Sequence, residues 1–200
     1  MDAATRIDRP VLTMPAEEAE AVRAAYEAAS VILEYGSGGS TVMASEMPGK
    51  QVFSVESDKA WAQDMRAWFE QNPPAGGTQI DVIWSDIGPT KKWGHPADHS
   101  GWERFARYPL EVWDLAEFRQ PDVVLVDGRF RPGCALATAF RTLKPVTVLI
   151  DDYAKRRQYH KVEPYIGSPQ MVGRLARFEV KPRPVPADKL IEIIRMMTQP

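Results

Sequence analysis

The chain has 200 residues, 44% of them hydrophobic and 26% charged, which is enough for one domain with a substantial buried core. Its net charge of −2 disfavours a nonspecific nucleic-acid-binding protein, because such proteins are usually basic. The single cysteine, Cys134, excludes an internal disulfide and a cysteine-cluster metal site, and we expect it to be buried and inert. No signal-peptide pattern or membrane-length apolar run is present. We therefore expect one cytoplasmic domain over residues 1–200, with no nucleic-acid or membrane partner.

The first half of the chain alternates predicted helices and strands. The pattern predicts helices over 15–29, 41–47 and 58–71, and strands over 31–33, 52–55 and 80–84. Pro15 suits the first turn of the first helix, which lies within an N-terminal helical segment, 1–30. Asp58 can cap the third helix. That helix carries one apolar stripe, formed by Trp61, Met65, Trp68 and Phe69.

The second half continues the alternation and then changes character. Strands are predicted over 121–126 and 146–150, with a helix over 134–143 between them. Segments 171–181 and 190–197 are predicted to form a β-rich pair, joined by a proline-rich link. Strands that alternate with helices form a mostly parallel sheet covered on both faces. The sequence therefore predicts an α/β fold, with a doubly wound, mostly parallel Rossmann-like sheet and a β-rich C-terminal pair.

Residues 87–120 do not fit this alternation. The segment is long, is interrupted by proline and glycine, and carries several aromatic residues. A long insertion at the carboxyl end of a parallel strand is a common place for an active-site lid. We expect a lid over 88–101, and over 102–118 a helix whose aromatic side chains pack against the sheet.

Acidic residues end four of the predicted strands. They are Glu34, Glu56, Asp86 and Asp127. In an open parallel sheet, ligands bind outside the carboxyl ends of the strands, where the strand order reverses. One acid at such a place often only caps a helix. Four in succession, with a glycine-rich turn after the first, indicate a ligand site.

The turn after the first strand consists of Gly36, Ser37, Gly38, Gly39 and Ser40. Its glycines allow torsions and a close ligand approach that a Cβ would prevent, and N–H groups of the following helix would face the ligand. The pattern is not GxGxxG, since Thr41 stands at the third glycine position, and no P-loop motif is present.

The strand-end acids then suggest what the turn binds. Glu34 is placed to meet a cationic amino group, and Glu56 suits two ribose hydroxyls. Asp86 can accept a hydrogen bond from the amine of adenine. An amino acid, a ribose and an adenine together describe S-adenosylmethionine.

Four runs in the core resemble the successive motifs of class I S-adenosylmethionine-dependent methyltransferases. They are LEYGSGGST (33–41), SVESD (54–58), SDIG (85–88) and VDGRF (126–130), in the order and spacing of that family. The resemblance spans residues 31–153, with Ser40 in place of the usual third glycine. It implies that Glu34 and the turn 36–40 hold the methionine part of the cofactor, Glu56 the ribose, and Asp86 with Ile87 the adenine. It does not name the methyl acceptor.

A finer resemblance concerns Asp127, Asp151 and Asp152. The fourth and fifth strands are expected to be neighbours, about 4.8 Å apart, so the acids at their ends converge. Three such carboxylates repel one another unless one is protonated or a hard cation lies between them. The pattern resembles metal-dependent O-methyltransferases of the catechol and macrolide-sugar type, which implies that these acids hold Mg²⁺. The alternative is that Asp151 is held by hydrogen bonds and Asp152 caps a helix.

The catalytic base departs from the catechol-type pattern. Those enzymes carry a lysine after the fourth-strand aspartate, whereas Gly128, Arg129, Phe130 and Arg131 follow here. Asp127 is therefore the predicted catalytic residue. His95, His99 and His160 are alternative bases, although each alone is more typical of a surface residue. Arg129 and Arg131 favour an acceptor that carries an acidic group.

These observations favour a small-molecule methyltransferase that acts on oxygen with the help of Mg²⁺. An alternative is a nucleoside-binding protein of the same fold without catalytic activity, which the missing lysine motivates. A related aminopropyl transferase is disfavoured because the surrounding arginines do not suit a polycationic acceptor. The sequence predicts no oligomeric state.

Overall fold

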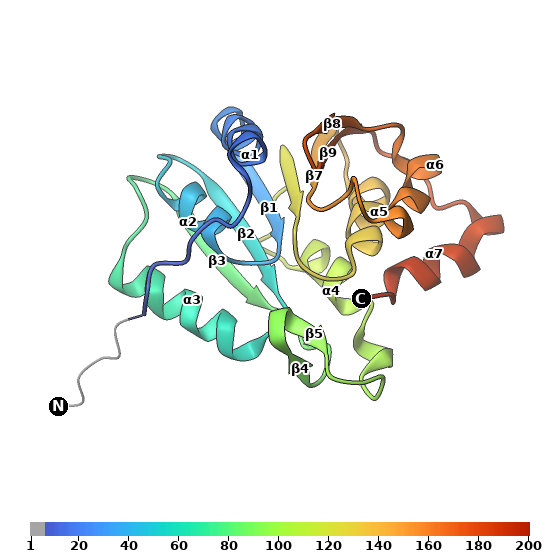
Figure 1. Ribbon diagram of the computed structural model, residues 1–200, viewed down its shortest axis with the longest axis horizontal. Coiled ribbons are helices and arrows are strands. Elements are labelled where there is room, and N and C mark those ends of the chain that lie inside the picture. The colour runs from blue at the N-terminus through green and yellow to red at the C-terminus, as the bar shows by residue number, and fades with distance from the viewer. Residues whose placement is uncertain (1–6) are drawn as a thin grey trace.

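The computed structural model describes residues 7–200 and is built on one seven-stranded sheet (Figure 1). The strand order is β3-β2-β1-β6-β7-β9-β8. Neighbours from β3 to β7 are parallel, whereas β9 runs antiparallel to both β7 and β8. The strands are β1 (Val31–Tyr35), β2 (Gln51–Glu56), β3 (Gln79–Trp84), β6 (Val123–Val126), β7 (Val146–Ile150), β8 (Gln170–Val172) and β9 (Leu175–Val180). The predicted α/β class and mostly parallel sheet are confirmed.

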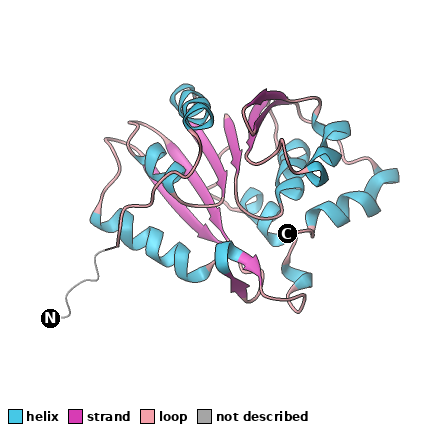
Figure 2. Ribbon diagram, viewed as in Figure 1, coloured by secondary structure: helices cyan, strands magenta, loops and turns pink. Residues whose placement is uncertain are grey.

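Helices cover both faces of the sheet (Figures 1 and 2). The helices are α1 (Ala16–Ala28), α2 (Gly39–Ser45), α3 (Lys59–Gln71), α4 (Arg107–Leu110), α5 (Arg131–Arg141), α6 (Glu163–Ile166) and α7 (Leu190–Met197). Alternate side chains of each strand point to opposite faces. Thus Ile32 of β1 packs in the cluster that α1 and α2 form, whereas Leu33 packs with α5 on the other face. None of the helices in residues 7–200 is long and apolar enough to span a bilayer.

The insertion after β3 has two parts. Its first part contains a two-stranded antiparallel hairpin of β4 (Thr90–Lys91) and β5 (His95–Pro96), which lies at the carboxyl end of the sheet (Figure 1). The second part is a series of short helical turns rather than one helix. Its aromatic side chains, except the exposed Trp102, pack against the sheet.

The C-terminal segment corrects one prediction. Residues 170–180 form the antiparallel pair β8–β9, but the segment 190–197 is the helix α7 (Figure 2). Ile193, Met196 and Met197 are buried at the i, i+3 and i+4 positions typical of a helical face. They face α5 at Gly133, where a Cβ would lie 2.9 Å from the Cα of Met197. This close contact stabilises a helix in an isoleucine-rich segment that resembles a strand.

Candidate cofactor site

The strand order reverses between β1 and β6, and the loops after these two strands meet. Gly36 has a φ of +104°, and a Cβ on it would lie 2.8 Å from the backbone nitrogen of Gly128. A Cβ on Gly128 would in turn overlap the hydroxyl of Tyr108. The carbonyl of Tyr35 accepts hydrogen bonds from the N–H groups of Asp127 (2.9 Å) and Gly128 (2.6 Å). Glycine is therefore required at both positions, since the two loops are in backbone contact.

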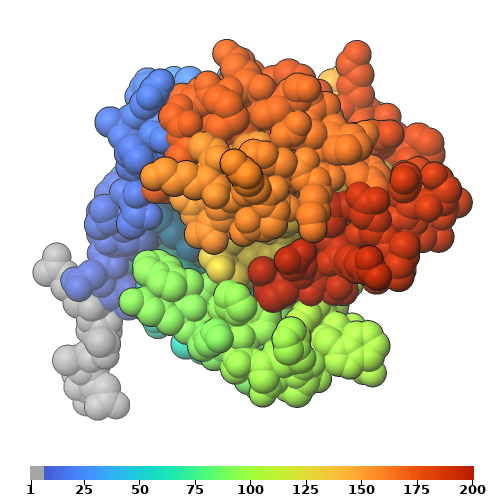
Figure 3. Space-filling model, turned by 45° about the vertical axis from the view of Figure 1, so that its right-hand side comes forward, coloured from blue at the N-terminus to red at the C-terminus, as the bar shows by residue number. Residues whose placement is uncertain are grey.

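A cavity of about 650 Å³ opens above this junction. Its volume lies within the range of about 300–1,000 Å³ that is typical of small-molecule sites. The hollow is bordered by the N-terminal segment and the β4–β5 hairpin, with the segment after β6 on its floor (Figure 3). The lining residues are 10–13, the predicted turn Gly36, Ser37, Gly38, Gly39 and Ser40, then Glu56, Asp58, Trp61, 92–94, and Asp127, Gly128 and Arg129. The structure thus brings most of the predicted site residues together.

Glu56 lies in the wall of this cavity at the end of β2. Its Oε1 accepts hydrogen bonds from the N–H groups of Ser57 (2.7 Å) and Asp58 (2.8 Å). Its Oε2 has one long contact, 3.3 Å from the nitrogen of Ser37. Burial raises the pKa of Glu56, which the backbone N–H donors partly oppose. One carboxylate oxygen is therefore fixed by the backbone, and the other faces the cavity and the glycine turn.

Glu34 lies beneath the turn rather than in the cavity wall. It is fully buried, and it accepts hydrogen bonds from the hydroxyls of Tyr26 (2.6 Å), Thr41 (2.6 Å) and Ser54 (3.0 Å). Burial raises its pKa, and these hydroxyl donors lower it in part. Because Thr41 also accepts from the N–H of Gly38 (2.9 Å), Glu34 holds the turn in place from behind.

Asp86 and Ile87, the predicted adenine contacts, do not line the cavity. Asp86 forms an ion pair with Arg104, with Nη1 and Oδ2 2.6 Å apart, and it accepts from the N–H of Gly88. The latter hydrogen bond and Arg104 lower its pKa. Ile87 is fully buried in the core. The β3 end therefore anchors the insertion instead of lining the cavity.

Two further segments border the cavity. In the β4–β5 hairpin, Gly94 accepts a hydrogen bond from the hydroxyl of Ser57 (2.9 Å), and a Cβ on Gly94 would overlap that hydroxyl. Next to it, Trp93 adopts a φ of +66° and is 73% exposed. On the opposite side, Leu12 crosses the glycine turn so closely that a Cβ on Gly39 would overlap its backbone. The hairpin lies within the predicted lid 88–101, whereas the segment at Leu12 was not assigned to the site from the sequence.

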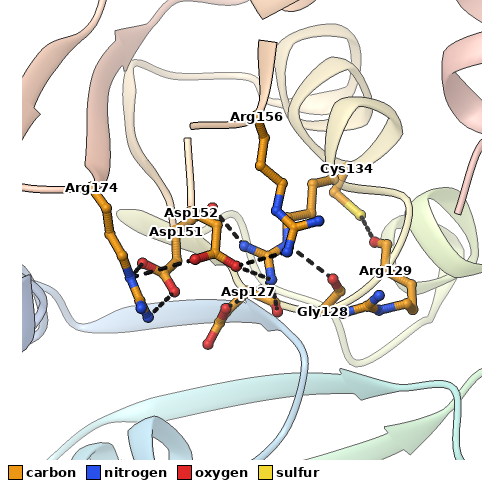
Figure 4. Close-up of polar contacts among 9 residues, drawn as sticks. Asp127, Gly128, Arg129, Cys134, Asp151, Asp152, Arg156 and Arg174 are labelled. Carbon is orange, nitrogen blue, oxygen red and sulfur yellow. Dashed lines mark hydrogen bonds and ion pairs between the residues drawn. The ribbon is translucent and has the colours of Figure 1, made fainter. Parts of the chain in front are cut away.

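The acids at the ends of β6 and β7 do converge, and arginines pair with them (Figure 4). Asp151 is buried and accepts two hydrogen bonds from Arg174, from Nε (2.8 Å) and Nη2 (2.7 Å). Asp152 lies 3.4 Å from Nη2 of Arg156 and 3.5 Å from Nε of Arg174. Asp151 is thus held by hydrogen bonds, as in the alternative that the sequence left open, whereas Asp152 pairs with arginines instead of capping a helix.

Arg131 forms ion pairs with the same cluster. Its side chain is only 5% exposed, and its Nη2 lies 3.1 Å from a carboxylate oxygen of Asp127. It also donates to the carbonyls of Asp127, Gly128 and Asp151. These contacts use the guanidinium within the protein, so the predicted contact of Arg131 with an acidic acceptor is not what the structure shows.

This donor set does not fit a magnesium ion. Each of Asp127, Asp151 and Asp152 is already charge-paired with a guanidinium group, which supplies the positive charge that three crowded carboxylates require. Within residues 7–200, no group of three or more His, Cys, Asp or Glu is arranged to hold a metal ion. The structure therefore does not support the predicted role of these three residues as metal ligands.

Asp127 differs from the other two acids because it also faces the cavity. Its surroundings raise its pKa from 3.8 to about 7, chiefly through burial and further through Asp151 and Asp152, while Arg131 opposes the change. Its side chain keeps 32% of its surface exposed. Among the histidines, His160 stacks on Tyr153, and none of the three lines the cavity. Cys134 is buried, as expected.

Comparison with known proteins places this geometry in a family. No protein-family model and no curated protein sequence matches the chain. A methyltransferase-like protein from Silicibacter pomeroyi DSS-3, solved by crystallography, is 61% identical, with a TM-score of 0.94, over 96% of this chain and 99% of that one.

Two more distant structures share the fold. The O-methyltransferase TomG from Streptomyces achromogenes, solved with S-adenosylmethionine, is 16% identical, with a TM-score of 0.57, over 86% of this chain and 82% of that one. Cofactor-bound Rv0187 from MTB is 15% identical, with a TM-score of 0.59, over 88% of this chain and 85% of that one. These two structures show the fold. The 61% identical relative, together with the glycine turn at the point where the strand order reverses, shows that this chain belongs to the class I S-adenosylmethionine-dependent methyltransferase family.

Proposed function

We propose that the protein transfers a methyl group from S-adenosylmethionine to an oxygen atom of a small-molecule acceptor. The observation that carries this proposal is one cavity that joins the glycine turn 36–40, the strand-end acid Glu56 and the partly exposed Asp127. A cofactor site and a group able to accept a proton thus share one space. The volume of this cavity suits small molecules rather than a polymer.

The residues of the cavity fit this cofactor. A Cβ on Gly38 would point into open space, so the absence of a side chain leaves room above the turn. The Oε2 of Glu56, which has only one long hydrogen bond, suits a ribose hydroxyl. We assign the adenine side to the hairpin residues Trp93 and Gly94 in place of Asp86 and Ile87, because Trp93 and Gly94 line the cavity and Asp86 and Ile87 do not. When bound, S-adenosylmethionine supplies an electrophilic methyl group on a positively charged sulfur.

The proposed role of Asp127 is that of a general base. A base works best when its pKa lies near the working pH, and that of Asp127 is about 7. Its carboxylate would take the proton from the acceptor hydroxyl as that oxygen attacks. The hydrogen bond from its N–H to the carbonyl of Tyr35 and the ion pair with Arg131 fix its position. The proposal requires no metal, because Arg131, Arg174 and Arg156 pair with Asp127, Asp151 and Asp152.

The test is methyl transfer from radiolabelled S-adenosylmethionine to a panel of phenols, catechols, hydroxy acids and sugars. We expect turnover with at least one acceptor, and a loss of about 100-fold or more in Asp127→Asn, the size usual for removal of a general base. Asp64→Asn is the matched control, because Asp64 is exposed on α3 outside the cavity. Turnover that is equal in both variants would refute the role of Asp127.

Binding without turnover would support the second candidate, a nucleoside-binding protein that lacks catalysis. Two observations favour this second candidate: no lysine follows Asp127, and the 61% identical relative is called only methyltransferase-like. Measuring both binding and methyl transfer distinguishes the two functions. A protein that binds S-adenosylhomocysteine but methylates no acceptor in the panel is a binding protein.

A further inference from the structure

We propose that Arg129 is a specificity-determining residue that binds a carboxylate of the methyl acceptor. The inference rests on the proposed function, because it places the acceptor in the same cavity. It adds the chemical class of that acceptor, a small hydroxylated carboxylic acid. Arg129 lines the cavity two residues after Asp127.

The first observation is an unused hydrogen-bond donor. The Nε of Arg129 is buried and has no hydrogen-bond partner among residues 7–200. A buried N–H group without a partner is costly, and most such groups in folded proteins are paired. The residue as a whole is only partly buried, and it lines the cavity. We therefore expect a bound ligand to supply the hydrogen-bond acceptor for this N–H group.

The second observation is that the neighbouring arginines are already engaged. Arg131 donates to backbone carbonyls and contacts Asp127, Arg174 forms a two-bond pair with Asp151, and Arg156 contacts Asp152. Figure 4 shows the contacts of Arg174 and Arg156, whereas the only contact drawn for Arg129 is the one from Cys134 to its backbone carbonyl. Arg129 thus differs from the arginines around it, because no acid in residues 7–200 pairs with its side chain.

The third observation is the charge of the cavity. Its acidic side chains are Glu56, Asp58 and Asp127, and its cationic ones are Lys92 and Arg129. The ammonium of Lys92 lies 5.4 Å from the centre of the Trp93 ring, on the hairpin. Arg129 is therefore the cation on the Asp127 side of the cavity, where we place the acceptor.

The chemistry of the guanidinium group favours a carboxylate as its ligand. Arginine presents a planar set of N–H donors that matches the two oxygens of a carboxylate, and such charge-assisted hydrogen bonds are about twice as strong as neutral ones. A carboxylate on the acceptor would satisfy Nε and orient the hydroxyl toward Asp127. The methionine carboxylate of the cofactor is the other source of the same chemistry, so the test must separate the two.

The test observes the Arg129 Nε–H directly, by ¹H–¹⁵N NMR of the wild-type protein. The cross-peak is assigned by its absence in Arg129→Lys. The protein is saturated with S-adenosylhomocysteine and then titrated with sodium benzoate or with neutral benzyl alcohol. We expect benzoate to move the Arg129 cross-peak saturably and benzyl alcohol to leave it in place. The Nε–H of Arg131, which donates to the carbonyl of Gly128 at 3.0 Å, is the internal control and should not move.

Each other outcome overturns either the role of Arg129 or the proposed function. A cross-peak that benzoate leaves unmoved refutes carboxylate binding at Arg129. A cross-peak that S-adenosylhomocysteine alone moves, with no further change on benzoate, assigns the residue to the cofactor and refutes the acceptor assignment. If S-adenosylhomocysteine moves no cavity resonance at all, the proposed function fails rather than the role of Arg129.

A kinetic comparison gives an independent readout. We expect the wild type to prefer 3,4-dihydroxybenzoate over catechol by about tenfold or more in kcat/KM, since one charge-assisted hydrogen bond separates them. Arg129→Gln should lower that preference to near one. Arg119→Gln is the matched control, because Arg119 is exposed and lies outside the cavity. Equal kcat/KM for the two compounds in the wild type would refute the inference.

Discussion

Replacing Asp127 with asparagine should make the protein more stable at alkaline pH while removing its activity. Asparagine keeps the size of the side chain and its acceptor oxygen toward Arg131, but it removes the negative charge. The raised pKa of Asp127 means that the folded protein disfavours the ionised form even with Arg131 beside it. The proposed general base must be ionised, and its ionised form is unfavourable in the folded protein. Removing the charge therefore stabilises the fold.

The magnitude follows from the pKa. The change from 3.8 to about 7 corresponds to about 4 kcal/mol at about 1.36 kcal/mol per pKa unit. Because the side chain is 32% exposed, solvent screening reduces this figure, and we expect about 2 kcal/mol at pH 8. In a chain of this size, that raises Tm by about 4–8 °C.

The direction of the pKa change determines the pH range over which Asp127 affects stability. The folded pKa of Asp127 is above its unfolded value, so its contribution is most favourable below about pH 4 and is lost as the pH rises through about 7. The advantage of Asp127→Asn should therefore shrink to below about 1 kcal/mol at pH 4.5. Thermal unfolding followed by circular dichroism at pH 4.5 and 8 measures both values, with Asp64→Asn as control. A variant that is less stable than the wild type at pH 8, or an advantage that does not change with pH, would refute the reasoning.

Three further predictions test the glycine contact, the hairpin and the metal. Gly128→Ala should cost about 1–3 kcal/mol by chemical denaturation, because its Cβ would overlap the Tyr108 hydroxyl, whereas Gly76→Ala, with no atom within 4 Å of its Cβ, should change little. Trp93→Ala should weaken S-adenosylhomocysteine binding about tenfold by calorimetry through lost aromatic contact, with Trp102→Ala as the exposed control outside the cavity; equal affinities would contradict the role of the hairpin. Treatment with EDTA should leave methyl transfer within about twofold of the untreated rate, because guanidinium groups already pair with the acids, and activity restored only by Mg²⁺ would count against that account.

The sequence was most informative where local pattern and function coincide. The strand and turn from β1 into the glycine turn, the acid that ends β2 and the Asp58 cap of α3 could be predicted, because each depends on residues close together in the chain. The cap is present, with the Asp58 carboxylate accepting from the N–H groups of Ala60 and Trp61. The convergence of Asp127 with Asp151 was also predictable, because neighbouring parallel strands end at the same edge.

Long-range partners were not predictable. Asp86 has the position of a ligand contact, but Arg104 from the insertion pairs with it. The acid cluster resembled a metal site because Arg174, which lies in the turn between β8 and β9, gives no local sign of its role. Likewise, the isoleucine-rich segment 190–197 favours a strand on its own composition, and packing against Gly133 of α5 makes it a helix.

The most direct test of the central claim is titration calorimetry of the wild-type protein with S-adenosylhomocysteine. If the cavity above the glycine turn is the cofactor site, the titration will show one site per chain with micromolar affinity. Glu56→Gln will weaken the binding, because Oε2 of Glu56 faces the cavity. No heat of binding at millimolar ligand, or an affinity that Glu56→Gln leaves unchanged, would contradict the assignment of this cavity.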